Sequence, residues 1–449
     1  MPLRLRQLLF VILATIFALA APAVIFYTTG YRYNFNKNTI EKTGALVLDS
    51  VPAKAGITLN GRHTARATPT SFNHILPDDY LIRMEKDGYH AWEKTLSVIS
   101  EHTTFATNVL FFRNSSPQIT VQKKIQKIIV APKNDAAIFT TSETDGQATE
   151  LWLWNLKNDP ELKFESETPI ENLSWSETGK NILIKTKTKT VSKFYLVSRD
   201  NTAAVSVSAI TNKDWSYLAW SSDNDSVLLG LTLLGNVAYK IDLNDKSLKK
   251  IGSGYETIWE EGSRLFALML SVKGLKLLEI FEDAAKQPYE IAGLKTGDYN
   301  FIKSRPGLLT LIDAKTPRLY VLDPKLNNNA VLIEERANLA TWSPSSKRLL
   351  ISDGFEIHIF EPEKNEIKFL TRYGTLIKKA LWINSEEHLL LEFNDSIWGI
   401  EIDSRDNRYS PTLVSGKNLE DLFLDGNHET AFFTAETNTG RRLFALPIK

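Results

Sequence analysis

Residues Asn338 to Glu361 read NLATWSPSSKRLLISDGFEIHIFE, and a version of this pattern recurs along most of the chain. A turn that begins with Trp342 separates two apolar stretches. Asp353-Gly354 is then a strong signal for a two-residue hairpin turn before an alternating run. The pattern predicts three short antiparallel strands. A three-stranded unit cannot bury both of its faces alone, so it must stack on copies of itself.

The copies align on the Trp342 position at intervals of 39 to 45 residues, at Val130, Trp175, Trp220, Trp259, Ile302, Trp342, Trp382 and Phe423. About 40 residues accommodate four strands and their turns, which is one blade of a β-propeller. The fold class is therefore predicted to be all-β, with an eight-bladed propeller over residues 117–449. Seven blades remain the alternative if Phe423 is not a blade position. The segment Gln118 to Val121 stands before the first copy, and we expect it to supply the missing outer strand of the last one.

The Trp-Ser-x-x-x-Lys pattern that begins at Trp342 resembles the WD-like repeats of bacterial translocation-protein-B-type propellers. The resemblance covers Pro117 to Lys449, although single repeats diverge from one another.

An uncharged run of 20 residues, Leu8 to Tyr27, follows Arg4 and Arg6 near the N-terminus. As a helix it would be about 30 Å long, which matches the hydrocarbon core of a bilayer. We expect a cytoplasmic tail and transmembrane anchor over residues 1–28 and a juxtamembrane linker over 29–43. The alternative is a cleavable signal peptide, because Ala18-Leu19-Ala20 resembles a cleavage site. The aromatic residues after the run favour an anchor.

Between residues 44 and 112, short strands are separated by turns such as Asn60-Gly61 and Asp87-Gly88, which suggests a small β-sandwich. The order of Pro52-Ala53-Lys54-Ala55, Asn60-Gly61, Thr68-Pro69, Leu76-Pro77, Lys86-Asp87-Gly88-Tyr89 and Trp92 resembles a PEGA domain, a small β module of bacterial and archaeal envelope proteins. Asp78 replaces the glycine that usually follows the second proline. The resemblance implies a non-catalytic module just outside a membrane anchor, and residues 113–116 are expected to form a hinge.

Composition excludes several classes of function. Lysine plus arginine equals aspartate plus glutamate, at 53 each, so the basic excess typical of nucleic-acid binding is missing. The sequence contains no cysteine, which excludes disulfides, thiolate metal sites and cysteine nucleophiles.

Candidate sites are few. The blade tryptophans are expected to pack between sheets. The four histidines of the small domain, at 63, 74, 90 and 102, lack metal-type spacing. Carboxylate pairs occur at Glu260-Glu261, Glu334-Glu335 and Glu386-Glu387, where a solvated loop is the default. No catalytic, cofactor-binding or metal residue is predicted, and no cofactor is expected.

The sharpest local pattern is the alternation of lysine and threonine from Lys185 to Thr190. In a strand this period places Lys185, Lys187 and Lys189 on one face, where they form a possible electrostatic contact stripe for an anionic polymer or lipid head groups. A solvated hairpin that discourages edge aggregation is the alternative.

Together these features predict a single-pass membrane protein of the cell envelope with most of the chain on the extracytoplasmic side. It would act as a non-catalytic binding or scaffolding platform, and its partners would be the membrane and a protein or cell-wall glycan, not nucleic acid. The alternatives are a propeller-cleft glycan hydrolase or lyase that uses acidic residues, and a scaffold that faces the cytoplasm.

Overall fold

The computed structural model describes residues 3–35, 37–142, 148–188, 192–283, 286–302, 305–326 and 330–449. The chain divides into two compact units. The first comprises residues 1–114 together with 399–411 and 449, and the second comprises 115–398 and 412–448. The boundary near residue 114 lies within the hinge predicted for residues 113–116.

The N-terminal helix α1 (Leu3–Thr28) contains the apolar run. Its segment Leu5–Thr28 has a mean hydropathy of 2.7, and none of its residues is buried against the protein. Arg32 stabilises the end of the helix, because Nη1 donates to the carbonyl of Tyr27 at 2.6 Å and the guanidinium lies over the Tyr27 ring. By length and composition, α1 is able to cross a membrane. A signal sequence can have the same length and composition.

Two sheets form the β-sandwich of the first unit, after a two-stranded ribbon of β1 (Tyr31–Asn34) and β2 (Thr39–Lys42). One sheet has the order β6-β3-β9 and the other β5-β4-β7-β8. Alternate residues of β3 and β8 face inward and are buried, as the period of two in a strand requires. Asp78 begins β7. The strands are β3 (Gly44–Val51), β4 (Gly56–Leu59), β5 (Arg62–Ala67), β6 (Thr70–Ile75), β7 (Asp78–Glu85), β8 (Trp92–Val98) and β9 (Thr103–Leu110).

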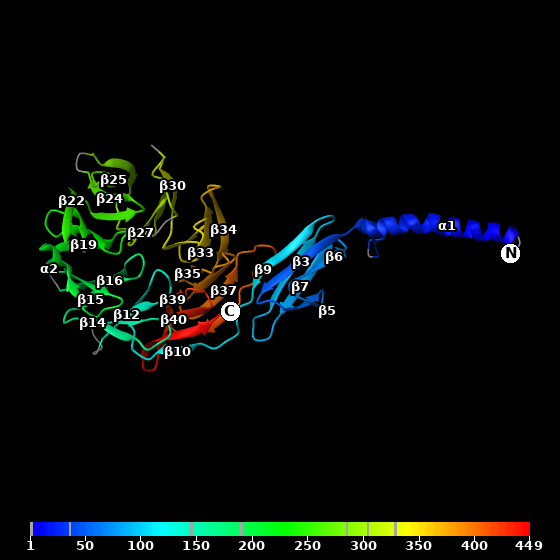
Figure 1. Ribbon diagram of the computed structural model, residues 1–449, viewed down its shortest axis with the longest axis horizontal. Coiled ribbons are helices and arrows are strands. Elements are labelled where there is room, and N and C mark those ends of the chain that lie inside the picture. Colours follow the sequence, from blue (N-terminus) through cyan, green and yellow to red (C-terminus); the bar gives the residue numbers. More distant parts are fainter. Residues whose placement is uncertain are drawn as a thin grey trace. The chain divides into compact units, whose positions relative to one another are not determined.

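The second unit is a β-propeller, in which the described residues form a succession of eight four-stranded antiparallel sheets (Figure 1). Each of the first seven runs in chain order from the innermost strand outward. The first four sheets are β11 (Lys127–Val130), β12 (Ala137–Thr141), β13 (Glu150–Trp154) and β14 (Glu161–Glu165); β15 (Ile170–Trp175), β16 (Asn181–Lys187), β17 (Ser192–Ser198) and β18 (Val205–Ser206), followed by helix α2 (Val207–Thr211); β19 (Trp215–Trp220), β20 (Val227–Thr232), β21 (Val237–Asp242) and β22 (Ser247–Ser253); and β23 (Thr257–Glu261), β24 (Arg264–Ser271), β25 (Gly274–Ile280) and β26 (Tyr289–Leu294).

The next three sheets are β27 (Tyr299–Ile302), β28 (Leu309–Asp313), β29 (Leu319–Leu322) and β30 (Val331–Glu335); β31 (Leu339–Trp342), β32 (Leu349–Ser352), β33 (Glu356–Glu361) and β34 (Glu366–Arg372); and β35 (Lys379–Trp382), β36 (His388–Glu392), β37 (Ser396–Glu401) and β38 (Thr412–Ser415). All eight positions aligned with Trp342 lie on the first strand of a sheet.

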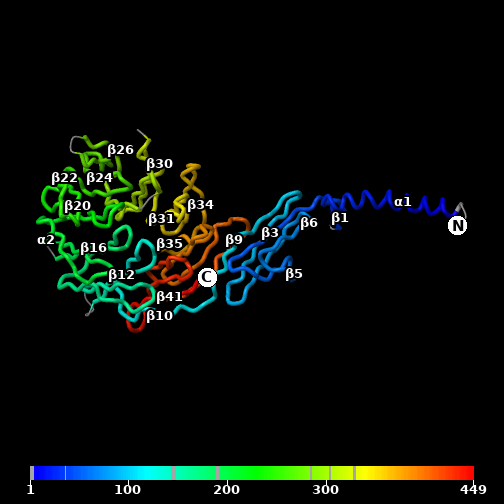
Figure 2. The backbone as a smooth tube through the Cα atoms, viewed as in Figure 1, coloured from blue at the N-terminus to red at the C-terminus, as the bar shows by residue number. Residues whose placement is uncertain are grey.

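The last sheet combines segments from both ends of the repeat region. Its strands are β39 (Glu420–Leu424), β40 (Thr430–Thr437), β41 (Gly440–Pro447) and β10 (Gln118–Val121), in that spatial order. Figure 2 shows β10 beside β41, and the two strands pair antiparallel. The predicted role of Gln118 to Val121 as the closing outer strand is confirmed.

The propeller core lies between neighbouring sheets. One apolar cluster, for example, joins Ile138 and Leu153 of the first sheet to Leu173 and Ile184 of the second. Another joins Phe139 of the first sheet to Phe423 of the last, so the packing continues around the ring. Because each sheet packs against its neighbours on both faces, second strands such as β20 and β32 are almost wholly buried.

Candidate ligand-binding cavity of the propeller

The candidate site is a cavity of about 570 Å³ that is lined mainly by innermost strands of the propeller and by the turns that follow them. The strands are β11, β31, β35 and β39. Its walls include the aromatic residues Trp342, Trp382 and Phe423, and its polar lining includes Lys379 and Asp421. A concave, mostly apolar site with a few charged groups is typical of ligand-binding pockets.

The tryptophans are held in place by hydrogen bonds to the preceding sheet. Trp342 Nε1 donates to Thr310 Oγ1 at 3.0 Å, and Trp382 Nε1 donates to the carbonyl of Thr341 at 2.9 Å. Trp175 and Trp220 donate to the carbonyls of Ile129 and Ser174 in the same way. The blade tryptophans therefore pack and bond between sheets, as the sequence predicts, and their orientation in the cavity wall is fixed.

Lys379 is the unusual residue of the site. It is the first residue of β35 and pairs across the sheet with Glu392 of β36. Burial lowers the pKa of the Lys379 ammonium, although the carboxylates of Glu392 and Asp421 act in the opposite direction. In the described part of the chain, no carboxylate lies within ion-pair distance of its Nζ. Its charge is therefore only partly compensated.

The neighbouring carboxylates already have partners. Glu392 is 2% exposed and accepts the Leu422 amide at 2.6 Å, and burial raises its pKa. Asp421 accepts a hydrogen bond from Thr434 Oγ1 at 2.9 Å and lies 4.0 Å from Arg441 Nη1. Asp421 also has a φ of 60°, a left-handed conformation that is uncommon outside glycine and that occurs often at functional sites.

Two ion pairs next to the cavity connect the strands that carry Lys379 and Asp421. Lys378 Nζ lies 3.2 Å from Glu420 Oε1, and Arg441 pairs with the other oxygen of the same carboxylate. Lys378 also donates to the carbonyl of Leu419 at 3.0 Å. These pairs join the start of β35 to β39 and to β41, so they hold the strands that carry Lys379 and Asp421.

Sequence reasoning missed Lys379, Asp421 and Glu392. For Lys379 and Asp421 the available signal was a charged residue within an innermost strand, whereas Glu392 ends the second strand β36. That signal is weak, because other innermost strands also carry charged residues, such as Glu171 and Glu260, and only the folded propeller places β35 beside β39.

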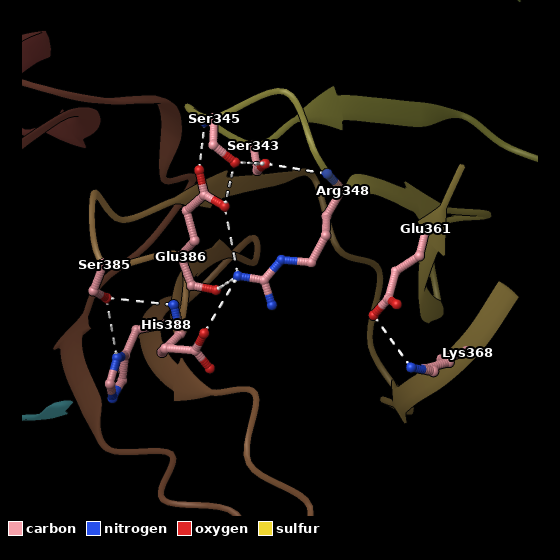
Figure 3. A network of polar contacts seen from close by, with 9 residues as sticks. Ser343, Ser345, Arg348, Glu361, Lys368, Ser385, Glu386 and His388 are labelled. Atoms are coloured by element: carbon pink, nitrogen blue, oxygen red, sulfur yellow. Dashed lines mark hydrogen bonds and ion pairs between the residues drawn. The ribbon is translucent and has the colours of Figure 1, made fainter. Parts of the chain in front are cut away.

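Two of the three carboxylate pairs noted in the sequence contain acids with structural roles. Glu386 accepts hydrogen bonds from the amide and the hydroxyl of Ser345, the latter at 2.9 Å, and Arg348 bridges to Glu387 at 3.4 Å (Figure 3). Burial raises the pKa of Glu386, but these hydrogen bonds outweigh it and hold the pKa below its usual value. Glu260 likewise accepts from Ser221 of the preceding sheet. These acids join the turns of adjacent sheets.

The lysine stripe lies partly outside the described residues, because Lys189 is not among them. Lys185 and Lys187 share one partner, Glu171, at 2.8 and 3.2 Å. The hydrogen bond from Lys185 is the largest cause of the lowered pKa of Glu171. The two lysines therefore lie on one face, as the alternation predicts, and both bind a carboxylate of the neighbouring strand β15.

A larger groove of about 930 Å³ lies beside β25, β26, β29 and β30. Its lysines Lys276 and Lys295 each lie 2.6 Å from a glutamate, so most of its charge is compensated within the protein. Among the described residues, no cluster of histidine, aspartate and glutamate could hold a metal ion.

The first unit contains a buried ion pair of its own. Lys94 of β8, whose side chain is 0% exposed, pairs with Glu401, and Glu401 also accepts from the indole of Trp92 at 3.0 Å. Segment 399–411 therefore contributes to the interior of this unit. Gly399 is required there, because a Cβ at this position would overlap the ring of Phe112.

These features define a modular protein with an apolar N-terminal helix, a small β-sandwich and a β-propeller. Residues 43–111 match the PEGA domain family, which confirms the resemblance seen over residues 44–112. No curated protein matches the sequence.

Three of the solved structures that resemble the chain illustrate its fold. The crystal structure of the eukaryotic initiation factor has 10% identity and a TM-score of 0.51, over 75% of this chain and 88% of that chain. Dihydro-heme d1 dehydrogenase NirN in complex with DHE has 12% identity and a TM-score of 0.46, over 65% and 67%. The beta-propeller domain of Myceliophteria thermophila Cps50 (Swd1) has 11% identity and a TM-score of 0.36, over 62% and 99%. At such identities a likeness concerns the fold and not the function.

Proposed function

We propose that this protein is a membrane-anchored envelope protein that acts as a non-catalytic binding platform, and that the propeller cavity is its ligand-binding site. The observation that carries the proposal is the partly compensated Lys379 ammonium inside a cavity with fixed aromatic walls. The apolar helix α1 supports the anchor, and the PEGA domain supports a non-catalytic role. The bulk of the chain lies on the extracytoplasmic side in this proposal, and the partner is a protein or a glycan of the envelope.

A photocrosslinking experiment in cells tests the cavity as a binding site. The photoreactive residue p-benzoylphenylalanine replaces Asn384, which is exposed and lines the cavity, in the full chain. The matched control places it at Lys347, an exposed turn residue outside the cavity lining. We expect a crosslinked species from position 384 that is missing from position 347. Equal crosslinking at both positions would contradict the proposal.

The second candidate is a glycan hydrolase or lyase, and the raised pKa of Glu392 beside Asp421 is the observation that favours it. Against it, Glu392 is buried and does not line the cavity. Turnover of an envelope glycan by the purified protein, lost in both Glu392→Gln and Asp421→Asn, would replace the binding proposal with this one.

A further inference from the structure

We infer that the propeller cavity recognises its ligand through a carboxylate group that pairs with Lys379. This inference rests on the proposed function and names the ligand chemistry of the same site. It concerns small ligands or chain ends, because the cavity measures about 570 Å³.

The first step of the argument is the charge balance around Lys379. Lys379 is half-buried in the cavity wall, and a partly desolvated ammonium without a close counter-ion is costly, so an anionic ligand would remove that cost. The groups that face Lys379 are Glu392 from β36 and Asp421 from β39. Beside them, Lys378 and Arg441 both pair with Glu420.

The second step is that neither neighbouring carboxylate supplies a full counter-charge. Burial favours the protonated form of Glu392, whose Oε2 is engaged by the Leu422 amide. Asp421 is shared with Thr434 and Arg441. A ligand carboxylate is therefore the group that would complete the pair, and such charge-assisted hydrogen bonds are short and strong.

The third step concerns the rest of the ligand. Trp342, Phe423 and Pro132 give the wall an apolar, partly aromatic surface, and Asn134 and Asn384 add amide groups. His428 also lines the cavity. This lining suits a compact body with hydroxyl or amide groups. Both an acidic sugar and the C-terminus of a peptide combine such a body with one carboxylate.

Pairs of acid and amide probes test whether the carboxylate or the rest of the ligand determines binding. Glucuronate is compared with glucuronamide, and N-acetyl-alanyl-alanine is compared with its C-terminal amide. Binding to the full chain in detergent micelles is measured by isothermal titration calorimetry. We expect one of the two acids to bind at least about tenfold more tightly than its amide, which corresponds to about 1.4 kcal/mol.

Variants at position 379 test the assigned residue. Lys379→Met should abolish the preference for the acid, whereas Lys379→Arg should retain it because the charge remains. Lys347→Met, at an exposed turn, is the matched control and should bind as the wild type does. For the wild type, affinity should fall as the pH rises and Lys379 loses its proton. Lys379→Arg should not show this loss. Melting temperatures of all variants show whether each one folds.

The outcomes are separable. Preference for glucuronate identifies an acidic sugar as the ligand class, and preference for the free peptide identifies a chain terminus. Equal affinity for acid and amide, an unchanged preference in Lys379→Met, or binding of neither acid would overturn the inference. Crosslinking at position 384 is independent of the ligand's charge, so it would still decide whether the cavity binds anything.

Discussion

Individual buried charges are the most informative residues of this protein. Lys94 of the first unit is buried and Lys379 of the second is half-buried in the cavity wall, and the two differ in how their charge is met. Lys94 has a direct carboxylate partner in Glu401, whereas Lys379 has none within ion-pair distance among the described residues. A charged side chain that has its ion-pair partner inside the protein contributes to the structure. A charged side chain without such a partner is a candidate contact for a ligand.

Removing one member of the complete pair should be costly. Glu401→Ala removes the nearer carboxylate partner of the buried Lys94 ammonium and leaves only Asp403, at 3.5 Å, so we expect it to destabilise the first unit by about 3 kcal/mol. Arg83→Ala is the control, because the ion pairs of Arg83 with Glu85 and Glu93 are exposed and should be worth at most about 1 kcal/mol. Urea denaturation of the full chain measures both. A loss for Glu401→Ala no larger than that for Arg83→Ala would contradict this account.

Glu392 should give the protein a characteristic pH dependence. Its pKa is raised above 4.5 in the folded state by burial, so the folded state holds the proton more tightly than the unfolded state. The resulting stability is fully present below the unfolded pKa and is lost as the pH rises through the folded pKa. The melting temperature of the wild type minus that of Glu392→Gln should therefore decrease from pH 4 upward and then become constant. A difference that increases with pH would show that the sign is wrong.

At the scale of the elements, the blade strands could be predicted because their signal is local and repeated. Trp175, Trp220, Trp342 and Trp382 mark innermost strands whose indoles bond to the preceding sheet. The cavity could not be predicted in the same way. Lys379 and Asp421 are 42 residues apart in number and meet only because β35 and β39 are neighbours in the ring. The contribution of segment 399–411 to the first unit is similarly non-local.

The closing strand β10 offers a test at this scale. Ile119 pairs with Phe444 of β41, and its side chain is 43% exposed. Ile119→Pro removes a backbone N–H and restricts the strand, so it should destabilise the propeller by about 3 kcal/mol and expose β41 to proteases. Ile119→Thr keeps the N–H and a β-branched side chain and should be close to neutral. Similar proteolysis of the two variants would show that β10 does not hold the ring closed.

At the scale of the whole molecule, the proposed membrane anchor predicts that the propeller lies on the extracytoplasmic side. The lack of cysteine allows a direct measurement, because Thr188→Cys would be the only thiol in the chain. Thr188 is exposed at the end of the β16 hairpin strand. We expect a membrane-impermeant maleimide to label it in intact cells. Labelling only after permeabilisation would place the propeller in the cytoplasm, and the wild-type chain is the control for background.

The pairing of β10 with β41 also constrains biosynthesis. The outermost strand of the last sheet is made before any other strand of the propeller, and its partner is made after all the others. During translation or export, the nascent propeller therefore carries two unsatisfied sheet edges until the final hairpin emerges. A ribosome-stalled chain that lacks β41 should need a chaperone to prevent strand addition between copies, whereas release of the last hairpin should end that need.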